Sequence, residues 1–514
     1  MNRNCHLFTS WHNLVAFWTG SIMVAIGVAL HLPMFLMGRH TGWRLVGMPI
    51  DNGMLMGMAF IVLGIGATAY GLLPRRSAQH SPHSSVLPPE DSPLTHAHWL
   101  QIGVLAIALI IDVMKASSLG FVIPGMRAEY GLSAAQVAVL PLFALLGTTV
   151  GSFLWGALAD LYGRRASLLL AAVFFVGTSI CGAMPSFGWN VFMCIMMGLA
   201  AGGMLPVANA LLAEIMPTKH RGWCLVLIGG IGTIGGYFAT SAASALLQPY
   251  FGWRIMWLIG FPTGLMLIAL SPLLPESARF LLEMGRIEEA RQTLASYGGK
   301  IMAMQRPQPT QTRVVKSQPL LGVTIALTLA ALAWGFANFG ILLWLPTALV
   351  TEGRSVALAS AVIARSALIA VPTVAVATYL YSLWSTKRVL ILAIAVTTLG
   401  LVATLLRATP LISVSLLVIG TSAVISILMP YAAESFPVRQ RGRATGWIAG
   451  CSKVGGVIAQ SLAAFSLVPA FGLAAGAIAL PTLASLLLIA GFGHETRGRD
   501  LRELETEVKA AEVP

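Results

Sequence analysis

The sequence predicts an all-α polytopic membrane protein with fourteen transmembrane helices. Of its 514 residues, 57% are hydrophobic and only 10% are charged, and the mean hydropathy is +0.80. A soluble domain carries about 25% charged residues. Apolar runs long enough to cross a bilayer, about 20 residues each, recur along the whole chain. The composition therefore excludes an ordinary soluble globular protein.

Two apolar runs come first, at about residues 13–37 and 51–73. The first is longer than the apolar core of a signal peptide and ends without the small residues of a cleavage site. A stretch rich in proline, serine and histidine follows, from Pro74 to His98, and this composition is typical of a linker. Residues 1–98 are therefore expected to form two extra N-terminal transmembrane helices and a linker.

Twelve further apolar runs form the main body of the chain. The longest hydrophilic segment divides them into two groups of six. We therefore expect a six-helix bundle at 99–274, a central loop at 275–318, a second bundle at 319–493 and a tail at 494–514. The expected spans lie at about residues 99–124, 133–156, 166–186, 190–213, 222–248, 254–274, 319–350, 355–384, 387–407, 409–433, 444–468 and 471–492.

Basic residues are distributed unequally between alternate loops of these twelve spans. The central loop carries seven, from Arg279 to Lys316, whereas loops on the opposite side carry one or none. Since Lys and Arg concentrate on the cytoplasmic side, the central loop and the tail are predicted to be cytoplasmic, in a bacterial-type inner (plasma) membrane. The charges beside the two extra spans favour neither orientation, and an even number of spans would put the N-terminus inside.

The composition also excludes several other functions. The net charge of +13 lies mostly in short loops and the central loop, where it indicates topology and contact with anionic lipid, so no nucleic-acid partner is expected. The five cysteines form no CxxC pair and are interpreted as core residues. No Walker or Rossmann glycine motif is present. We therefore expect no cofactor, no metal site, no catalytic residue and no enzymatic activity.

A short charged turn joins the second and third of the twelve spans. It contains Gly156, Asp160, Gly163, Arg164 and Arg165 in the order Gly-x-x-x-Asp-x-x-Gly-Arg-Arg. Glycine permits a tight reversal, paired arginines mark a cytoplasmic helix end, and the acid can meet a helix N-terminus or a cation. The turn resembles the signature loop of the major facilitator superfamily, which lies at the same place in that fold. A solvated turn that only sets the orientation is the simpler alternative.

An internal repeat supports a chain built from two related halves. The segment from Glu214 to Arg221 returns 220 residues later, from Glu434 to Arg441, with its glutamate, proline and cations in place. One interpretation is an intracellular gate, in which Glu and Arg pairs form and break as the halves move. The alternative is two helix ends held at the lipid headgroups.

Two further motifs strengthen the family resemblance. The run from Pro275 to Ala290 resembles the Pro-Glu-Ser-x-Arg-[Trp/Phe]-Leu…Gly-Arg…Glu-Ala sequence of sugar porters and related organic-ion transporters. The run from His494 to Gly498 resembles their Pro-Glu-Thr-[Lys/Arg]-Gly sequence, with histidine in place of proline. The resemblance covers about residues 99–500 and implies a twelve-helix, two-bundle core with alternating access. It does not extend to residues 1–98.

The first core span carries the most specific resemblance. Asp112, Gly120 and Pro124 match the Asp-Gly-Tyr-Asp…Gly…Pro run of aromatic-acid and metabolite:proton symporters. Lys115 stands where those proteins carry a second acid. Because the charge is inverted there, the resemblance does not identify the substrate.

Few ionisable side chains lie inside the spans, and such residues usually line a cavity. Asp112 and Lys115 are three residues apart and share a helix face; Asp112 is the candidate proton carrier, and a static ion pair is the alternative. Lys115, Arg365 and Lys453 would together favour an anionic substrate. Arg365 is the strongest candidate for pairing with a carboxylate, and a position at the lipid headgroups is its alternative. Trp334 and Asn338 are candidate wall residues, although both are also ordinary packing residues.

These features favour a secondary active transporter. The hypothesis is proton-coupled symport of a small organic anion, a carboxylate metabolite, by a monomer in the lipid bilayer. Asp112 would carry the proton, and the buried cations would neutralise the substrate. Proton-driven export of a drug or metabolite, transport of an uncharged sugar or polyol, and a membrane receptor or assembly module are the alternatives.

Overall fold

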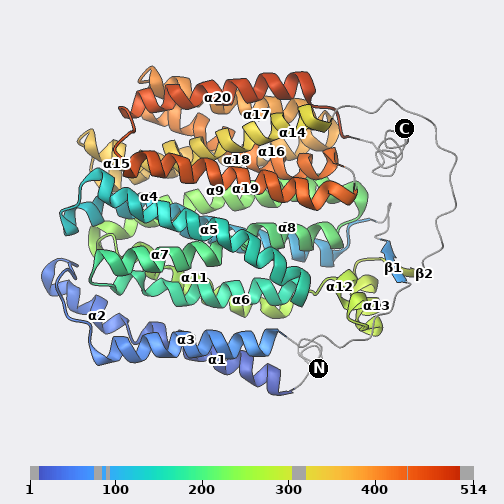
Figure 1. The fold of residues 1–514 in the computed structure, drawn as a ribbon, viewed down its shortest axis with the longest axis horizontal. Coiled ribbons are helices and arrows are strands. Elements are labelled where there is room, and N and C mark those ends of the chain that lie inside the picture. The colour runs from blue at the N-terminus through green and yellow to red at the C-terminus, as the bar shows by residue number, and fades with distance from the viewer. Residues whose placement is uncertain (1–10, 74–83, 88–92, 304–319, 437, 498–514) are drawn as a thin grey trace.

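The computed structural model describes residues 11–73, 84–87, 93–303, 320–436 and 438–497 (Figure 1). Within these ranges, thirteen helical segments are long and apolar enough to cross a membrane. A fourteenth long helix, α19 (Val438–Ala464), contains Arg439, Arg441, Arg443 and Lys453 and is therefore less apolar, but it packs against α14 and α5 inside the bundle. The expectation of fourteen transmembrane helices therefore agrees with the structure.

The first half of the core contains six spans. Two of them are interrupted, the fourth between α7 and α8 and the sixth between α10 and α11. α4 and α9 each exceed thirty residues, and α6 loosens into a 3-10 turn, η2, near its outer end. The elements are α4 (His96–Tyr130), α5 (Ala134–Tyr162), α6 (Arg164–Gly177), η2 (Thr178–Ala183), α7 (Phe187–Ala201), α8 (Met204–Ile215), α9 (Thr218–Phe251), α10 (Ile255–Leu258), α11 (Gly260–Ala269) and η3 (Ser271–Leu273).

The second half repeats this plan. Its first span is interrupted by a π-helical turn, η4, and such turns are frequent at functional sites. The elements are α14 (Leu320–Phe336), η4 (Ala337–Leu342), α15 (Leu343–Thr351), α16 (Val356–Leu383), α17 (Thr386–Leu405), α18 (Pro410–Ser435), α19 and α20 (Phe471–Phe492).

The two halves are packed most closely at their outer ends. One hydrophobic cluster there contains residues of both halves, including Phe121 and Leu343, whereas the inner parts of the halves form largely separate clusters. The Ser244 hydroxyl of α9 lies 2.7 Å from the Ser360 hydroxyl of α16. A Cβ atom at Gly120 would lie 2.7 Å from the Leu343 carbonyl oxygen. The glycine therefore permits the close contact between α4 and α15 that joins the halves on this side.

The two extra helices lie along the first half. The elements are α1 (Trp11–Ala29), α2 (Leu32–Met37), η1 (Gly38–Thr41) and α3 (Asn52–Leu72). α1 and α3 form a tight hairpin, because Gly20 and Gly64 let the two backbones touch. Both helices pack against α6, below the core in Figure 1. The hairpin is therefore a structural part of the first half.

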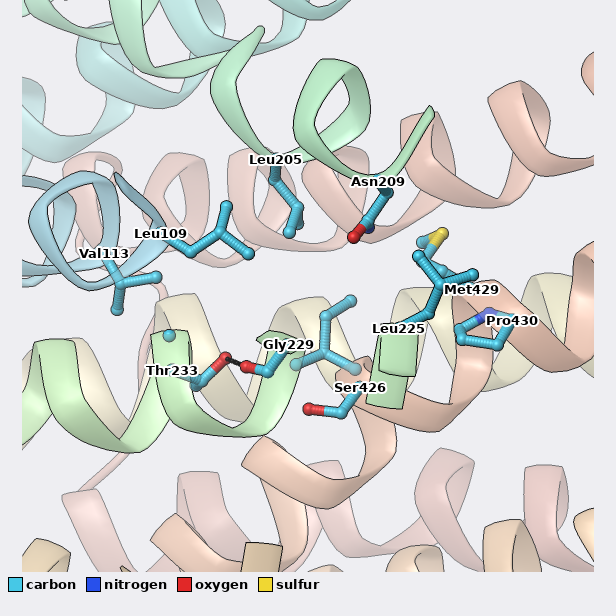
Figure 2. Close-up of a pocket in the computed structure, with 12 residues that line it drawn as sticks. Leu109, Val113, Leu205, Asn209, Leu225, Gly229, Thr233, Ser426, Met429 and Pro430 are labelled. Atoms are coloured by element: carbon cyan, nitrogen blue, oxygen red, sulfur yellow. Dashed lines mark hydrogen bonds between the residues drawn. The ribbon is translucent and has the colours of Figure 1, made fainter. Parts of the chain in front are cut away.

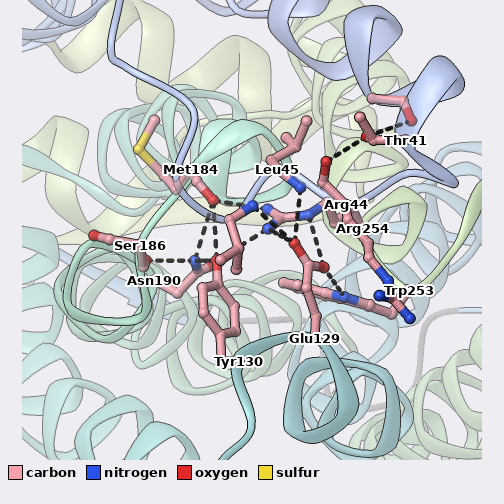
Figure 3. Close-up of polar contacts among 12 residues, drawn as sticks. Thr41, Arg44, Leu45, Glu129, Tyr130, Met184, Ser186, Asn190, Trp253 and Arg254 are labelled. Carbon is pink, nitrogen blue, oxygen red and sulfur yellow. Dashed lines mark hydrogen bonds and ion pairs between the residues drawn. The ribbon is translucent and has the colours of Figure 1, made fainter.

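A buried ion pair holds the outer end of this hairpin. Arg254 and Glu129 approach to 2.7 Å, and their side chains are 0% and 4% exposed (Figure 3). The same carboxylate accepts hydrogen bonds from the backbone N–H groups of Leu45 and Val46, at 2.8 and 3.2 Å, and from the indole of Trp253 at 2.8 Å. One glutamate thus joins the hairpin loop, α4 and the start of the sixth span.

The side of the molecule that is predicted to be cytoplasmic contains two short strands, which the all-α expectation did not include. β1 (Ser84–Leu87), in the linker, pairs antiparallel with β2 (Lys300–Ala303), in the central loop. Two four-residue strands are too short to show an alternating pattern, and their pairing depends on the fold bringing distant segments together. The central loop also contains α12 (Ala278–Glu283) and α13 (Ile287–Ser296), beside the strands in Figure 1. Since β1 of the linker pairs with β2 of the central loop, the linker end of the extra hairpin lies on the same side of the molecule as that loop, in agreement with an even number of extra spans.

Replacing Glu129 by glutamine should destabilise the protein substantially. The change leaves Arg254 buried without its counter-charge, and breaking a buried pair in this way costs about 3–5 kcal/mol. We expect a clear fall in Tm of the purified protein in detergent. Glu288→Gln is the matched control, because its pair with Arg291 is exposed and contributes about 0–1 kcal/mol. Equal Tm values for the two variants would contradict this account.

Candidate functional site

The centre of the molecule holds one acid and one cation from opposite halves. Asp112 lies in the middle of α4 and is buried, and its Oδ1 atom accepts no hydrogen bond. Lys453 of α19 lies within electrostatic reach of it across the interface. The Lys453 ammonium also lies 5.2 Å from the centre of the Phe339 ring. A cation over an aromatic face is stabilised by the ring, so these three residues form a charged centre between the halves.

The π-helical turn η4 supplies the wall of this centre. Asn338 is buried, and its amide oxygen accepts a hydrogen bond of 2.8 Å from the Tyr237 hydroxyl of α9. This bond crosses the interface, so Asn338 links the halves at the level of the charged centre. Trp334 is buried too, but its indole donates to the Thr421 carbonyl at 2.8 Å, and it packs within the second half. Of the two expected wall residues, Asn338 therefore lies at the interface.

Lys115 faces away from the interface. Its ammonium donates hydrogen bonds to the Phe175 carbonyl at 2.5 Å and to the Thr178 hydroxyl at 2.6 Å, and it lies 3.8 Å from the centre of the Phe175 ring. Phe175 is one of the last residues of α6, whose final carbonyls have no partner within the helix. Lys115 therefore caps α6, and no salt bridge joins it to Asp112 among the described residues.

Arg365 lies outside this group. Its side chain is exposed on α16, and seven residues before it Leu358 occupies the same helical face and is 54% exposed. The buried residues of the helix, among them Ile363 and Ala367, lie on the opposite side. The structure thus does not bring Arg365 to Asp112 and Lys453. Sequence reasoning cannot foresee this, because depth in a span does not determine the direction in which a side chain points.

A pocket lies between the halves beside the charged centre (Figure 2). It is bounded by α4, α8 and α9 of the first half and by α18 of the second. Val113, which directly follows Asp112, forms part of its wall. The lining residues are Leu109, Val113, Leu205, Asn209, Leu225, Gly229, Gly232, Thr233, Ile425, Ser426, Met429 and Pro430.

The signature turn is organised around Arg164. Its guanidinium pairs with Asp160 at 2.9 Å and with Glu214 at 3.0 Å, and it donates to the Ala159 carbonyl at 2.7 Å. The turn therefore binds the cytoplasmic ends of three spans together within the first half. Gly156 has no neighbour that a side chain would meet within 4 Å, so packing does not require this glycine.

A glutamate from the central loop completes the turn. Glu276 accepts hydrogen bonds from the backbone N–H groups of Arg164 and Arg165, at 2.9 and 3.3 Å, at the start of α6. An anion is favoured there by the unpaired N–H groups and the helix dipole. Gly163 has a φ of 104°, and any side chain at this position would collide with the Glu276 carboxylate.

The second half has a corresponding cluster. Glu434 accepts hydrogen bonds from the Tyr381 hydroxyl at 2.8 Å and the Thr496 hydroxyl at 2.7 Å. Gly222 of the first half lies against Glu434, since a Cβ there would come within 2.9 Å of its carboxylate. Arg221 lies at the start of α9, next to this contact. The side chain of Arg441 lies outside the described residues, so the expected gate stays a prediction.

Sequence reasoning missed Glu495, which repeats the role of Glu276. Glu495 accepts hydrogen bonds at the start of α17, from the Thr386 N–H at 2.9 Å, the Thr386 hydroxyl at 2.6 Å and the Ser385 hydroxyl. The available signal was its position, 219 residues after Glu276, close to the 220-residue repeat.

The two glutamates differ in their proton affinity. Burial raises the pKa of Glu276 above its ordinary value, and this outweighs the backbone hydrogen bonds, which lower it. Burial also acts to raise the pKa of Glu495, but the hydrogen bonds from Ser385 and Thr386 prevail and hold that pKa below its ordinary value. The ionised form is therefore favoured by folding at Glu495 and disfavoured at Glu276.

A model of the Major Facilitator Superfamily matches residues 105–460 of the chain. The niacin transporter NiaP of Acinetobacter baylyi is 25% identical over 81% of this chain and 98% of its own length. The gallate transporter of Pseudomonas putida is 27% identical over 79% of this chain and 94% of its own length. The structure of the xylose transporter XylE from E. coli in an inward open conformation is similar in fold, with a TM-score of 0.60, 17% identity, and coverage of 79% of this chain and 99% of that one.

The pH dependence of stability should distinguish Glu495 from Glu276. Because the pKa of Glu495 is lowered in the folded protein, its carboxylate stabilises the fold above the ordinary pKa of glutamate, and this contribution is lost as the pH falls through the lowered value. We expect Glu495→Gln to cost about 1 kcal/mol at neutral pH, with the difference in Tm from wild type vanishing in acid.

Glu276→Gln is the matched control, and its pH dependence has the opposite sign. Since the pKa of Glu276 is raised, its stabilising contribution is present at low pH and is lost as the pH rises through the raised value. The difference in Tm, Glu276→Gln minus wild type, should therefore increase as the pH rises. Parallel Tm profiles for the two variants between acid and neutral pH would refute the assignment.

Proposed function

The chain belongs to the Major Facilitator Superfamily, and on this basis we propose that it is a secondary active transporter that carries a small organic anion together with protons by alternating access. It is a multi-pass integral membrane protein of the bacterial inner-membrane type, and its relatives are transporters. The names niacin and gallate both denote carboxylic acids. These two relatives support a carboxylate as the substrate of this chain as well.

The proposal rests on the position of Asp112 and Lys453, which lie on opposite sides of the interface within electrostatic reach of each other. A substrate carboxylate that binds the Lys453 ammonium would stand near Asp112, and two negative charges in an apolar site repel each other. Binding is therefore favoured when Asp112 is protonated. Competition between the substrate and ionised Asp112 for the Lys453 ammonium would link a proton to the substrate.

The neighbouring groups fit the same mechanism. Lys115 is held by α6 and remains in the first half, so it contributes a fixed positive charge on the side of Asp112. The Tyr237–Asn338 hydrogen bond joins the halves beside the centre and must break if they separate there. The Arg164 and Glu434 clusters would serve as the intracellular gate, where Gly222 brings the halves into contact. Arg365 has no part in this proposal.

A sugar substrate is less well supported. Sugars are bound by several amides and hydroxyls, because each uncharged hydroxyl group needs hydrogen-bonding partners. The pocket beside the charged centre contains one amide, Asn209, and its walls are mainly apolar. The likeness to the xylose transporter is at 17% identity, and it supports the fold alone.

Uptake into proteoliposomes with an imposed pH gradient tests the proposal. With an inward proton gradient, we expect accumulation of nicotinate or another small carboxylate, and none of xylose or a cationic dye. Asp112→Asn should lose accumulation driven by the gradient, because an amide cannot exchange a proton. Xylose accumulation, or a wild-type rate for Asp112→Asn, would refute the proposal.

Lys453 and Arg365 provide a matched comparison of two cations in the second half. Lys453→Met should weaken carboxylate binding at least tenfold, since a hydrogen bond to a charged group contributes about 1.5–3 kcal/mol and about 1.4 kcal/mol is a factor of ten. Arg365→Met should change the Kd by less than about twofold, because its side chain faces away from the centre. The Kd of each purified variant for the transported carboxylate measures this difference. The reverse order would show that the cations are assigned wrongly.

A further inference from the structure

The pocket beside the charged centre has an apolar body and one unsatisfied amide. Its walls are formed mainly by aliphatic and thioether side chains, among them Leu109, Leu205, Leu225 and Met429. Asn209 of α8 extends into the space from one side (Figure 2). Its Oδ1 atom is shielded from solvent and accepts no hydrogen bond.

The other two polar side chains of the lining are already engaged. The Thr233 hydroxyl donates to the Gly229 carbonyl at 2.8 Å, and the Ser426 hydroxyl donates to the Ser422 carbonyl at 2.6 Å. Hydroxyl groups commonly bond to their own helix in this way. Asn209 therefore stands apart in this lining, because its amide offers both an acceptor and donors to whatever occupies the pocket.

An amide at this position is costly unless a ligand pairs with it. A buried polar group that lacks a partner destabilises the protein, and leucine, which has nearly the same shape, would avoid this cost. Leucine also matches the surrounding wall. The amide is thus best explained by a hydrogen bond made when the substrate is present.

The position of Asn209 indicates which part of the substrate it meets. The His98 ring lies 3.2 Å from the Ile215 carbonyl, which aligns the cytoplasmic ends of α4 and α8. Asp112 is fourteen residues beyond His98, and Asn209 is six residues from Ile215. At 1.5 Å per residue, Asn209 lies about 12 Å nearer the cytoplasm than Asp112. A substrate whose carboxylate binds Lys453 would therefore extend through the apolar space toward Asn209.

We infer that Asn209 is a specificity-determining residue that binds a hydrogen-bonding substituent at the end of the substrate opposite its carboxylate. The inference rests on the proposed function, since it concerns the body of the same anion. It identifies the substrate class as a carboxylate with one apolar ring or short chain and a hydroxyl or similar group at the far end. The apolar walls bind the body, and the amide selects among bodies of similar size.

Two matched pairs of probes test this role: benzoate with 4-hydroxybenzoate, and hexanoate with 6-hydroxyhexanoate. The Kd of each for the purified full-length protein is measured by calorimetry. In wild type, we expect the hydroxylated member of at least one pair to bind about tenfold more tightly, as one hydrogen bond to an otherwise unpaired amide contributes about that factor. In Asn209→Leu, the ratio of the two Kd values should approach one.

Leu205→Ala is the matched control in the same pocket. It removes apolar surface, so it should weaken both members of a pair equally and keep their ratio. Asn209→Ala provides a second variant, and a single symmetrical peak in size-exclusion chromatography verifies that each variant is folded. The ratio should fall in both Asn209 variants.

Three results would overturn the inference. Two leave the proposed function intact, and the third refutes it as well. If Lys453→Met abolishes binding but both Asn209 variants keep the wild-type ratio, Asn209 binds only water or nothing, and the proposed function stands. If wild type accumulates nicotinate but binds none of the four probes, the inference fails and the proposed function stands; if it neither accumulates nicotinate nor binds any of the probes, both fail.

Discussion

The proposed site depends most on the electrostatic attraction between Asp112 and Lys453, which lie in different halves. A charge in the apolar interior of a membrane protein costs several kcal/mol unless a counter-charge stands near it. Because these two residues belong to different halves, the attraction between them also acts between the halves. Under the proposed function, an anion that enters would compete with Asp112 for the same ammonium. In that proposal, substrate binding changes the electrostatic attraction between the two halves.

The other buried charges of the first half are used to build a single unit. Lys115 satisfies the end of α6 near the middle of the membrane. The Glu129–Arg254 pair fixes the loop of the extra hairpin at the outer side, and the β1–β2 pairing fixes its linker to the central loop at the inner side. The extra helices are thus held at both membrane surfaces, and we expect them to move together with the first half.

The two halves both place a glutamate at the start of a helix, but the residues around that glutamate differ. In each, a glutamate from a distant segment neutralises the start of a helix at the cytoplasmic surface: Glu276 at α6 and Glu495 at α17. In the first half, Arg164 adds ion pairs to Asp160 and Glu214. In the second half, hydroxyl groups donate hydrogen bonds to the corresponding acids, Glu434 and Glu495. The repeat therefore preserves a glutamate at the helix N-terminus more faithfully than it preserves the loop sequence.

The sequence by itself determined the fold class, the number of spans, the signature turn and the presence of Asp112 and Lys453 inside the membrane. These properties depend on local composition and on the length of apolar runs. The tertiary structure decided which way each cation within the spans points: Lys115 into the first half, Arg365 outward, and Lys453 toward the acid. It also decided the partner of Glu495. Direction and partnership depend on the rotation of a helix against its neighbours, which no local pattern in a uniformly apolar span specifies.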